Sequence, residues 1–117
     1  MTAGSVVLVD WGDALTKSGE PNKRRPGIVV SSPRFFGTGL PFEIVIPMTS
    51  TIELAIAGAS VAIPPTPTNG CTKLCYALSW SIQTVPHRRL MQTASRITPE
   101  QLAEIRGQIA SCVASDA

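Results

Sequence analysis

Short apolar runs separated by turn residues occupy most of the chain, a pattern that is typical of β-strands. Valine and isoleucine dominate the runs, and Gly, Pro, Ser and Asn fill the segments between them. Pro47, near the end of the third run, predicts a sheet edge or a β-bulge, because proline has no N–H to donate to a neighbouring strand. We expect five or six strands, at residues 5–11, 27–32, 42–48, 60–63 and 74–81, with 89–93 as the sixth.

The pattern changes to helical spacing near the end of the chain. Thr98 is followed by Pro99 and, three residues later, by Gln101, which is a capping-box arrangement with proline at the first helical position. Apolar residues then recur every three or four positions, as on one face of an amphipathic helix. They are Leu102, Ile105, Ile109, Cys112 and Val113. We therefore predict a C-terminal helix over residues 99–113.

These elements describe a mainly β domain, a small, partly open β-barrel with an amphipathic C-terminal helix packed on it. The chain has 117 residues, 44% of them hydrophobic, which is enough for one core, and we expect a single domain over residues 1–117. No apolar run approaches the roughly 20 residues that cross a bilayer, and the N-terminus lacks the features of a signal peptide. We expect a cytoplasmic protein without a membrane partner.

The three cysteines indicate reduced thiols rather than a disulfide framework. Cys71, Cys75 and Cys112 make an odd number and show no repeating spacing. A zinc site would need two further ligands beside Cys71 and Cys75, and the only histidine, His87, belongs to no paired motif. We expect no metal and no cofactor.

The positive charges are unevenly distributed, although the net charge is only +2. Residues 54–99 contain no Asp or Glu, and cations occur both in that segment and in the first third of the chain. If the two segments meet, one face is cationic and favours an anionic partner, either a nucleic-acid backbone or an acidic peptide. The cations are Lys23, Arg24, Arg25, Arg34, Lys73, Arg88, Arg89 and Arg96.

Arg25 is the most informative of these cations. Pro26 has a fixed φ and disfavours helix at the residue before it, so Arg25 is extended at the start of a β-branched run. A planar guanidinium held on a rigid backbone suits a phosphate better than it suits packing. The alternative is a solvated charged segment that leads into a strand.

Several short motifs follow one another along nearly the whole chain. Together they resemble the MazF/PemK family of toxin endoribonucleases. The resemblance implies an SH3-like barrel, a homodimer, metal-independent cleavage of single-stranded RNA, and inhibition by a cognate antitoxin, which we expect to be acidic. The motifs are V-D-W-G at 9–12, S-G-E at 18–20, R-P at 25–26, P-M-T-S at 47–50, P-P-T-P-T-N-G at 64–70, I-Q-T-V at 82–85, R-R-L at 88–90 and the helix at 98–109.

The chemistry that the resemblance implies points to three candidate catalytic residues. Cleavage without metal uses the 2′-hydroxyl as nucleophile, so the protein must take a proton, stabilise a phosphorane and protonate the leaving oxygen. Arg25 suits the second task, and Thr49, which matches the family's active-site threonine, would donate its hydroxyl to the same phosphate. Glu20 is a candidate base. Without the resemblance, Thr49 is also explained as a strand-end hydroxyl and Glu20 as an inert loop carboxylate.

Six further residues are candidates for RNA binding. Lys23 and Arg24 would contact phosphate or the antitoxin, and Ser50 would assist Thr49. Trp80 would stack on an unpaired base, as aromatic side chains do for single-stranded RNA. Gln83 and Arg88 complete the set.

One segment departs from the family pattern. Relatives commonly have a D-Q-I-R-T-V-like sequence where this chain has W-S-I-Q-T-V at 80–85, so Trp80 and Gln83 replace an acidic and a basic residue. We interpret the change as altered specificity, with weak activity or a degenerate antitoxin-binding homologue as alternatives. His87 next to this segment is an acid or base by its titration, or an exposed loop residue.

Two other functions remain open on the same fold. The chain could inhibit a protein target such as DNA gyrase, like the CcdB relatives of the family, or act as an inactive interaction module. Neither needs Arg25 and Thr49 to lie close together, whereas a ribonuclease does.

Overall fold

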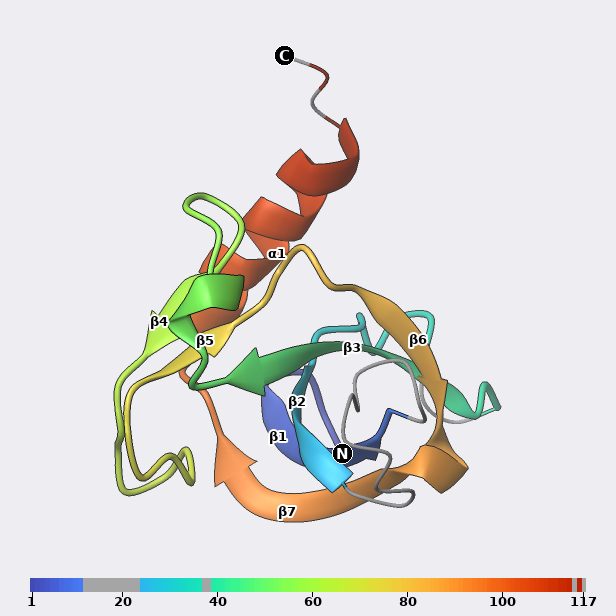
Figure 1. Cartoon of the computed structure of the whole chain (residues 1–117). Coiled ribbons are helices and arrows are strands. Elements are labelled where there is room, and N and C mark those ends of the chain that lie inside the picture. Colours follow the sequence, from blue (N-terminus) through green and yellow to red (C-terminus); the bar gives the residue numbers. More distant parts are fainter. Residues whose placement is uncertain (12–23, 37–38, 115, 117) are drawn as a thin grey trace.

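The computed structural model describes residues 1–11, 24–36, 39–114 and 116. The described part is mainly antiparallel β-sheet with one C-terminal helix, which confirms the predicted fold class (Figure 1). The strands are β1 (Ser5–Asp10), β2 (Arg24–Val29), β3 (Phe42–Thr49), β4 (Val61–Ile63), β5 (Cys75–Ala77), β6 (Gln83–Pro86) and β7 (Leu90–Arg96). The helices are α1 (Pro99–Ala114) and the short 3₁₀ turns η2 (Ile52–Leu54) and η3 (His87–Arg89).

The sheet curls into a partly open barrel. Its strand order is β4-β5-β3-β2-β1-β7, and β6 also pairs with β3, so β3 has two partners on one side. β6 and β7 follow one another in the chain with only η3 between them, and they pair with β3 and β1 respectively. The η3 turn therefore joins the two ends of the curled sheet β6-β3-β2-β1-β7 (Figure 1).

Strands β1 to β3 are buried on both faces, which explains their runs of β-branched residues. One face belongs to a cluster that includes Ile28, Ile46 and Ile105 of α1. The other face belongs to a second cluster in the barrel interior, which includes Val9 and Val45.

At Gly27, side chains from both neighbouring strands fill the space that a side chain would need. A Cβ at this position would lie 2.8 Å from Val9 Cγ2 and 2.9 Å from Val45 Cγ1. The absence of a side chain therefore lets β2 fit between β1 and β3, two residues after Arg25.

The helix begins as predicted. The Thr98 N–H donates to Gln101 Oε1 at 2.9 Å, and the Gln101 N–H donates to Thr98 Oγ1 at 3.1 Å, which completes the capping box. Ile105 is fully buried, but Val113 is 76% exposed, so the apolar face continues beyond the part of the sheet that covers it. None of the helices in the described residues is long and apolar enough to cross a membrane.

Several predicted strand boundaries were wrong. β2 begins at Arg24, three residues early, so both arginines lie within the strand, where Arg25 pairs with Val9. The run 74–81 forms strand only over Cys75–Ala77, and β6 was not predicted at all. β3 starts as expected and ends at Thr49.

Pro47 does not lie on a sheet edge. β3 pairs with β2 on one side, where Gly27 is opposite Pro47. On the other side the β6 pairing ends at Val45 and the β5 pairing begins at Met48. The missing N–H of Pro47 therefore falls where β3 changes partners, and the sheet loses no hydrogen bond there.

Candidate functional site

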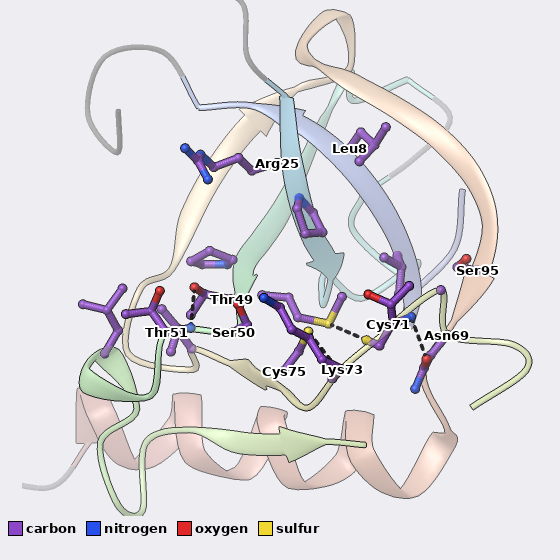
Figure 2. A pocket seen from close by; sticks show the side chains of 18 of the residues that line it. Leu8, Arg25, Thr49, Ser50, Thr51, Asn69, Cys71, Lys73, Cys75 and Ser95 are labelled. Carbon is purple, nitrogen blue, oxygen red and sulfur yellow. Dashed lines mark hydrogen bonds between the residues drawn. The ribbon is translucent and has the colours of Figure 1, made fainter. Parts of the chain in front are cut away.

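A groove with a volume of about 1000 Å³ opens on one side of the barrel (Figure 2). Its lining residues come from β1, β2, β3, β5 and β7, from the segment after β3, and from the loop between β4 and β5. We call this feature the groove. The polar and aromatic residues that matter below are Arg25, Thr49, Ser50, Lys73, Trp80 and Ser81.

Arg25 and Thr49 both line the groove, from neighbouring strands. The β2–β3 register pairs Gly27 with Pro47, and continuing it by two residues places Arg25 opposite Thr49 on the same face of the sheet. Figure 2 shows Arg25 at one end of the groove, above Thr49 and Ser50. The structure therefore brings the two principal candidate residues to one wall.

Arg25 carries an unsatisfied donor. The residue is half-buried, and its Nε is buried without a hydrogen-bond partner among the described residues. An unpaired buried donor is destabilising, which is typical of a site that awaits a ligand. A phosphate that accepted from this guanidinium would satisfy the donor.

Thr49 has its hydroxyl oriented by the backbone. The Thr51 N–H donates to Thr49 Oγ1 at 3.1 Å, so the oxygen already accepts one hydrogen bond (Figure 2). The hydroxyl hydrogen is then available to donate into the groove. Ser50 and Thr51, which follow in the chain, are exposed and line the groove as well.

Trp80 lines the groove from the segment after β5. Its indole Nε1 donates to the Leu54 carbonyl at 3.0 Å, and 39% of the residue is exposed. The hydrogen bond fixes the ring against η2 while it still lines the groove. This geometry is compatible with base stacking.

Lys73 is a lining residue that was not among the candidate site residues. β5 pairs Met48 with Ala77 and Thr49 with Tyr76, and continuing this register places Cys75 opposite Ser50. The residues just before Cys75 therefore run beside the end of β3. Together Arg25 and Lys73 give the groove two cations, and no carboxylate occurs among its described lining residues. Thr51 and Ser81 were missed in the same way.

Three of the predicted RNA-binding residues are not among the groove residues. Arg24 is exposed and lies opposite Asp10 in the β1–β2 register. Because side chains alternate along a strand, it points to the opposite face of the sheet from Arg25. Gln83 pairs with Val45 in β6, and Arg88 is exposed on η3. Glu20 and Lys23 lie outside the described residues.

Other cations have structural roles, so the expected cationic face forms only in part. Arg96 donates to Thr2 Oγ1 at 2.9 Å and to the Ala3 carbonyl at 3.0 Å. Arg106 donates to the Val30 carbonyl at 3.0 Å, where it holds α1 against the end of β2. Both side chains are committed to main-chain or hydroxyl oxygens away from the groove.

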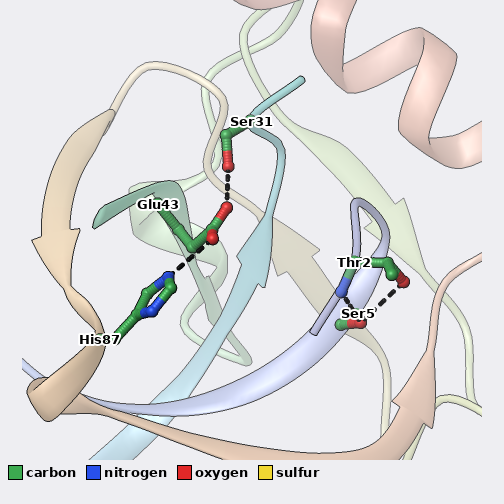
Figure 3. Close-up of polar contacts among 5 residues, drawn as sticks. All are labelled: Thr2, Ser5, Ser31, Glu43 and His87. Atoms are coloured by element: carbon green, nitrogen blue, oxygen red, sulfur yellow. Dashed lines mark hydrogen bonds and ion pairs between the residues drawn. The ribbon is translucent and has the colours of Figure 1, made fainter. Parts of the chain in front are cut away.

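A second polar cluster lies near the start of β3, at the opposite end of this strand from Thr49 (Figure 3). Glu43 is 5% exposed, Ser31 Oγ donates to its Oε1 at 2.5 Å, and His87 Nε2 lies 2.8 Å from its Oε2. We call Ser31, Glu43 and His87 the buried network. The His87 side chain is 38% exposed, but it begins η3 rather than lying in a loop, and its contact with Glu43 ties η3 to β3.

The comparisons with known proteins agree with this fold. The family model for the PemK-like, MazF-like toxins of type II toxin–antitoxin systems matches residues 2–113. The comparison with curated protein sequences gives no match.

The similar solved structures are endoribonucleases and MazF toxins. A mycobacterial endoribonuclease in complex with its cognate antitoxin has a TM-score of 0.74 at 18% identity, covering 97% of this chain and 94% of the other. MazF from Deinococcus radiodurans has a TM-score of 0.71 at 22% identity, with 98% and 97% covered. The Mycobacterium tuberculosis toxin MazF-mt6 has a TM-score of 0.69 at 16% identity, with 97% and 99% covered.

A curled antiparallel sheet with one C-terminal helix is therefore the architecture of the MazF-type toxins. This chain belongs to the PemK-like, MazF-like toxin family of type II toxin–antitoxin systems, the family of the MazF endoribonucleases.

Proposed function

We propose that this toxin is a metal-independent, sequence-specific endoribonuclease that cleaves single-stranded RNA in the groove. The observation that supports the proposal most strongly is the pairing of an unsatisfied guanidinium, Arg25, with an oriented hydroxyl, Thr49, on one wall of a groove that has cations and no described carboxylate. Both groups are donors, and both face the place where a phosphate would lie.

The proposed reaction is an internal transesterification. The ribose 2′-oxygen forms a bond to the adjacent phosphorus, and the bond from phosphorus to the 5′-oxygen of the next nucleotide breaks. The products are a 2′,3′-cyclic phosphate and a 5′-hydroxyl. Arg25 donates to the non-bridging oxygens as negative charge develops on them, and Thr49 donates to the same phosphate.

The reaction moves two protons: one leaves the 2′-hydroxyl, and one is delivered to the leaving 5′-oxygen, by an acid or by water, to give the 5′-hydroxyl. A base must accept the 2′-hydroxyl proton, and Glu20 is the proposed base from the sequence, although it lies outside the described residues. Ser50 and Lys73 would hold the phosphates on either side, and Trp80 would stack on an unpaired base. Lys23, Arg24, Gln83 and Arg88 would contribute weaker contacts beyond the groove.

We also propose that the active form is a homodimer, controlled by an acidic antitoxin. A relative of the same fold is known in complex with its cognate antitoxin. An acidic segment laid in the groove would meet Arg25 and Lys73 and would occupy the place of the RNA phosphates.

Cleavage of a long single-stranded RNA in EDTA tests the proposal. The purified protein should cut at a few sequences and leave cyclic phosphate and 5′-hydroxyl ends. Arg34→Ala is the matched control, since Arg34 is exposed beside Phe35 and does not line the groove. Arg25→Ala should lower the cleavage rate by about 10²–10³, while Arg34→Ala should cleave as the wild type does. A folded wild-type protein that leaves the RNA intact would instead favour a non-nucleolytic toxin that binds a protein such as DNA gyrase.

A further inference from the structure

Three sulfur side chains meet on the floor of the groove. Met48 comes from β3, Cys75 begins β5, and Cys71 lies in the loop between β4 and β5. The Cys71 thiol lies 3.8 Å from Met48 Sδ and neighbours Cys75, whose own thiol donates to the Lys73 carbonyl at 3.4 Å (Figure 2). None of these sulfurs has a part in the proposed RNA chemistry.

The segment that carries the two cysteines is held in place by Asn69. This residue is only 1% exposed, and its Oδ1 accepts the Thr66 N–H at 3.1 Å and the Cys71 N–H at 3.0 Å, while its Nδ2 donates to the Pro64 carbonyl at 2.8 Å. The pairing of β5 with β3 fixes the other end of the segment. The sulfurs are therefore positioned before any ligand arrives.

The access and spacing of the sulfurs suit a bound ion. Met48 is buried at the base, whereas Cys71 and Cys75 are half-buried and line the groove, so an ion can reach them from solvent. Two sulfur ligands that are each about 2.3 Å from one ion lie about 3.8–4.0 Å apart at tetrahedral to trigonal angles. The 3.8 Å between Cys71 Sγ and Met48 Sδ falls in this range.

The donor set selects a particular class of metal. Two thiols and a thioether are soft ligands, the type that copper(I) prefers. Zinc in structural sites takes four Cys, His or carboxylate ligands. The described residues contain no cluster of three or more His, Cys, Asp and Glu side chains, so a zinc site lacks its ligands there.

We infer that Met48, Cys71 and Cys75 form a binding site for one copper(I) ion on the floor of the groove. Binding replaces two S–H bonds by two copper–thiolate bonds and releases two protons, with no change of oxidation state. Two neutral thiols and one cation thus become a site with a net charge of −1.

Occupation of the site should lower RNA cleavage, an effect that depends on the proposed function. The new negative charge would lie in the same groove as Arg25 and Lys73 and would oppose the approach of phosphate. Lys73 lies between the two cysteines in sequence, so we expect the bound ion to affect Lys73 more strongly than Arg25. The copper-bound toxin would be the less active form.

An anaerobic titration with copper(I), with bicinchoninate as the coloured competitor, tests the site directly. The reduced wild-type protein should remove one equivalent of copper from the competitor, and the Cys71→Ser/Cys75→Ser double variant should not. Cys112→Ser, which changes the remaining exposed cysteine, should bind as the wild type does. Met48→Leu, a swap of similar volume, should bind at least tenfold more weakly.

Three results would overturn the inferred copper site: a wild-type protein that leaves the copper on the competitor, a double variant with unchanged affinity, or formation of a Cys71–Cys75 disulfide in place of a complex.

RNA cleavage is then measured with and without one equivalent of copper(I). The wild-type rate should fall at least tenfold, and the rate of the double variant should not change. Unchanged cleavage by the copper-bound wild type refutes the inhibition. Absence of cleavage without copper refutes the proposed function, while the titration still decides the metal site.

Discussion

The groove and the buried network place similar polar groups in opposite situations. In the groove, the described residues offer Arg25 Nε no partner, and the Thr49 hydroxyl still has a hydrogen to donate. In the buried network, both oxygens of Glu43 are occupied, one by Ser31 and one by His87. One cluster presents unsatisfied donors, and the other satisfies its members internally.

Whether a polar group has hydrogen-bond partners distinguishes binding residues from stabilising residues better than the type of residue does. His87 and Glu43 are the acid–base pair that a catalytic site would use, yet their contacts join β3 to η3 and close the barrel. Within the described part of the chain, Arg25 Nε and Trp11 Nε1 are the buried side-chain donors without a partner, and both residues line the groove. Satisfied polar groups specify a fold, and unsatisfied ones indicate where a ligand belongs.

The largest expected effect comes from Arg25→Ala. Loss of a transition-state donor of this kind typically lowers the rate by about 10²–10³, or about 2.7–4 kcal/mol. Thermal unfolding should show no loss of stability, because the substitution removes a buried donor for which the described part of the chain has no partner. Cleavage rates and melting curves of the same preparation check both parts.

Arg25→Lys sharpens this result. A lysine keeps the charge but not the planar fork, so cleavage should remain well below that of the wild type. If Arg25→Ala lost stability and activity together, Arg25 would be a structural residue and the contrast with the buried network would fail.

Glu43→Ala should give the opposite pattern. The substitution leaves Ser31 and His87 without their partner and creates a cavity, so the free energy of unfolding should fall by roughly 2–4 kcal/mol. Cleavage per folded molecule should stay near the wild-type value, because Glu43 does not line the groove. Urea unfolding and a rate normalised to folded protein are the measurements. A hundredfold loss of normalised rate would move Glu43 into the catalytic machinery.

The sequence predicted those elements that are stabilised by interactions between residues close together in the chain. The capping box at Thr98 and Gln101 is made within one helical turn, and the helix began where expected. β6 was missed because Gln83–Pro86 is short and contains one buried residue, Val85. Its strand conformation comes from pairing with β3, some forty residues earlier, which no local pattern indicates.

The same distinction applies to the candidate site. Arg25 and Thr49 were identified from motifs, and the structure brings them to one groove. Lys73 was missed because its place beside the end of β3 follows from the β3–β5 register. The partner of His87 lies 44 residues away in the sequence, so only the fold reveals that the histidine is paired.

Removing one hydroxyl from the groove and one from the buried network compares the two sites through smaller effects. Thr49→Val should lower cleavage by about tenfold, the value of one hydrogen bond of about 1.4 kcal/mol, with little effect on stability. Ser31→Ala should lower the free energy of unfolding by about 1–2 kcal/mol and leave the normalised rate unchanged. Equal effects of both substitutions on either measurement would show that the clusters are not functionally distinct.

The smallest expected effect concerns Cys71 and pH. Burial, followed by the neighbouring Cys75 thiol, raises the pKa of Cys71 from 9.0 to about 11. The folded state therefore keeps its proton where the unfolded chain has lost it, so the associated stability is complete below pH 9 and is lost as the pH rises through about 11. Alkylation of Cys71 by iodoacetamide, followed by mass spectrometry, should show a midpoint near pH 11 in the folded protein and near pH 9 in denaturant. A midpoint near 9 in both states would show that the groove does not shield this thiol, in contrast to the shielding that the buried network provides for Glu43.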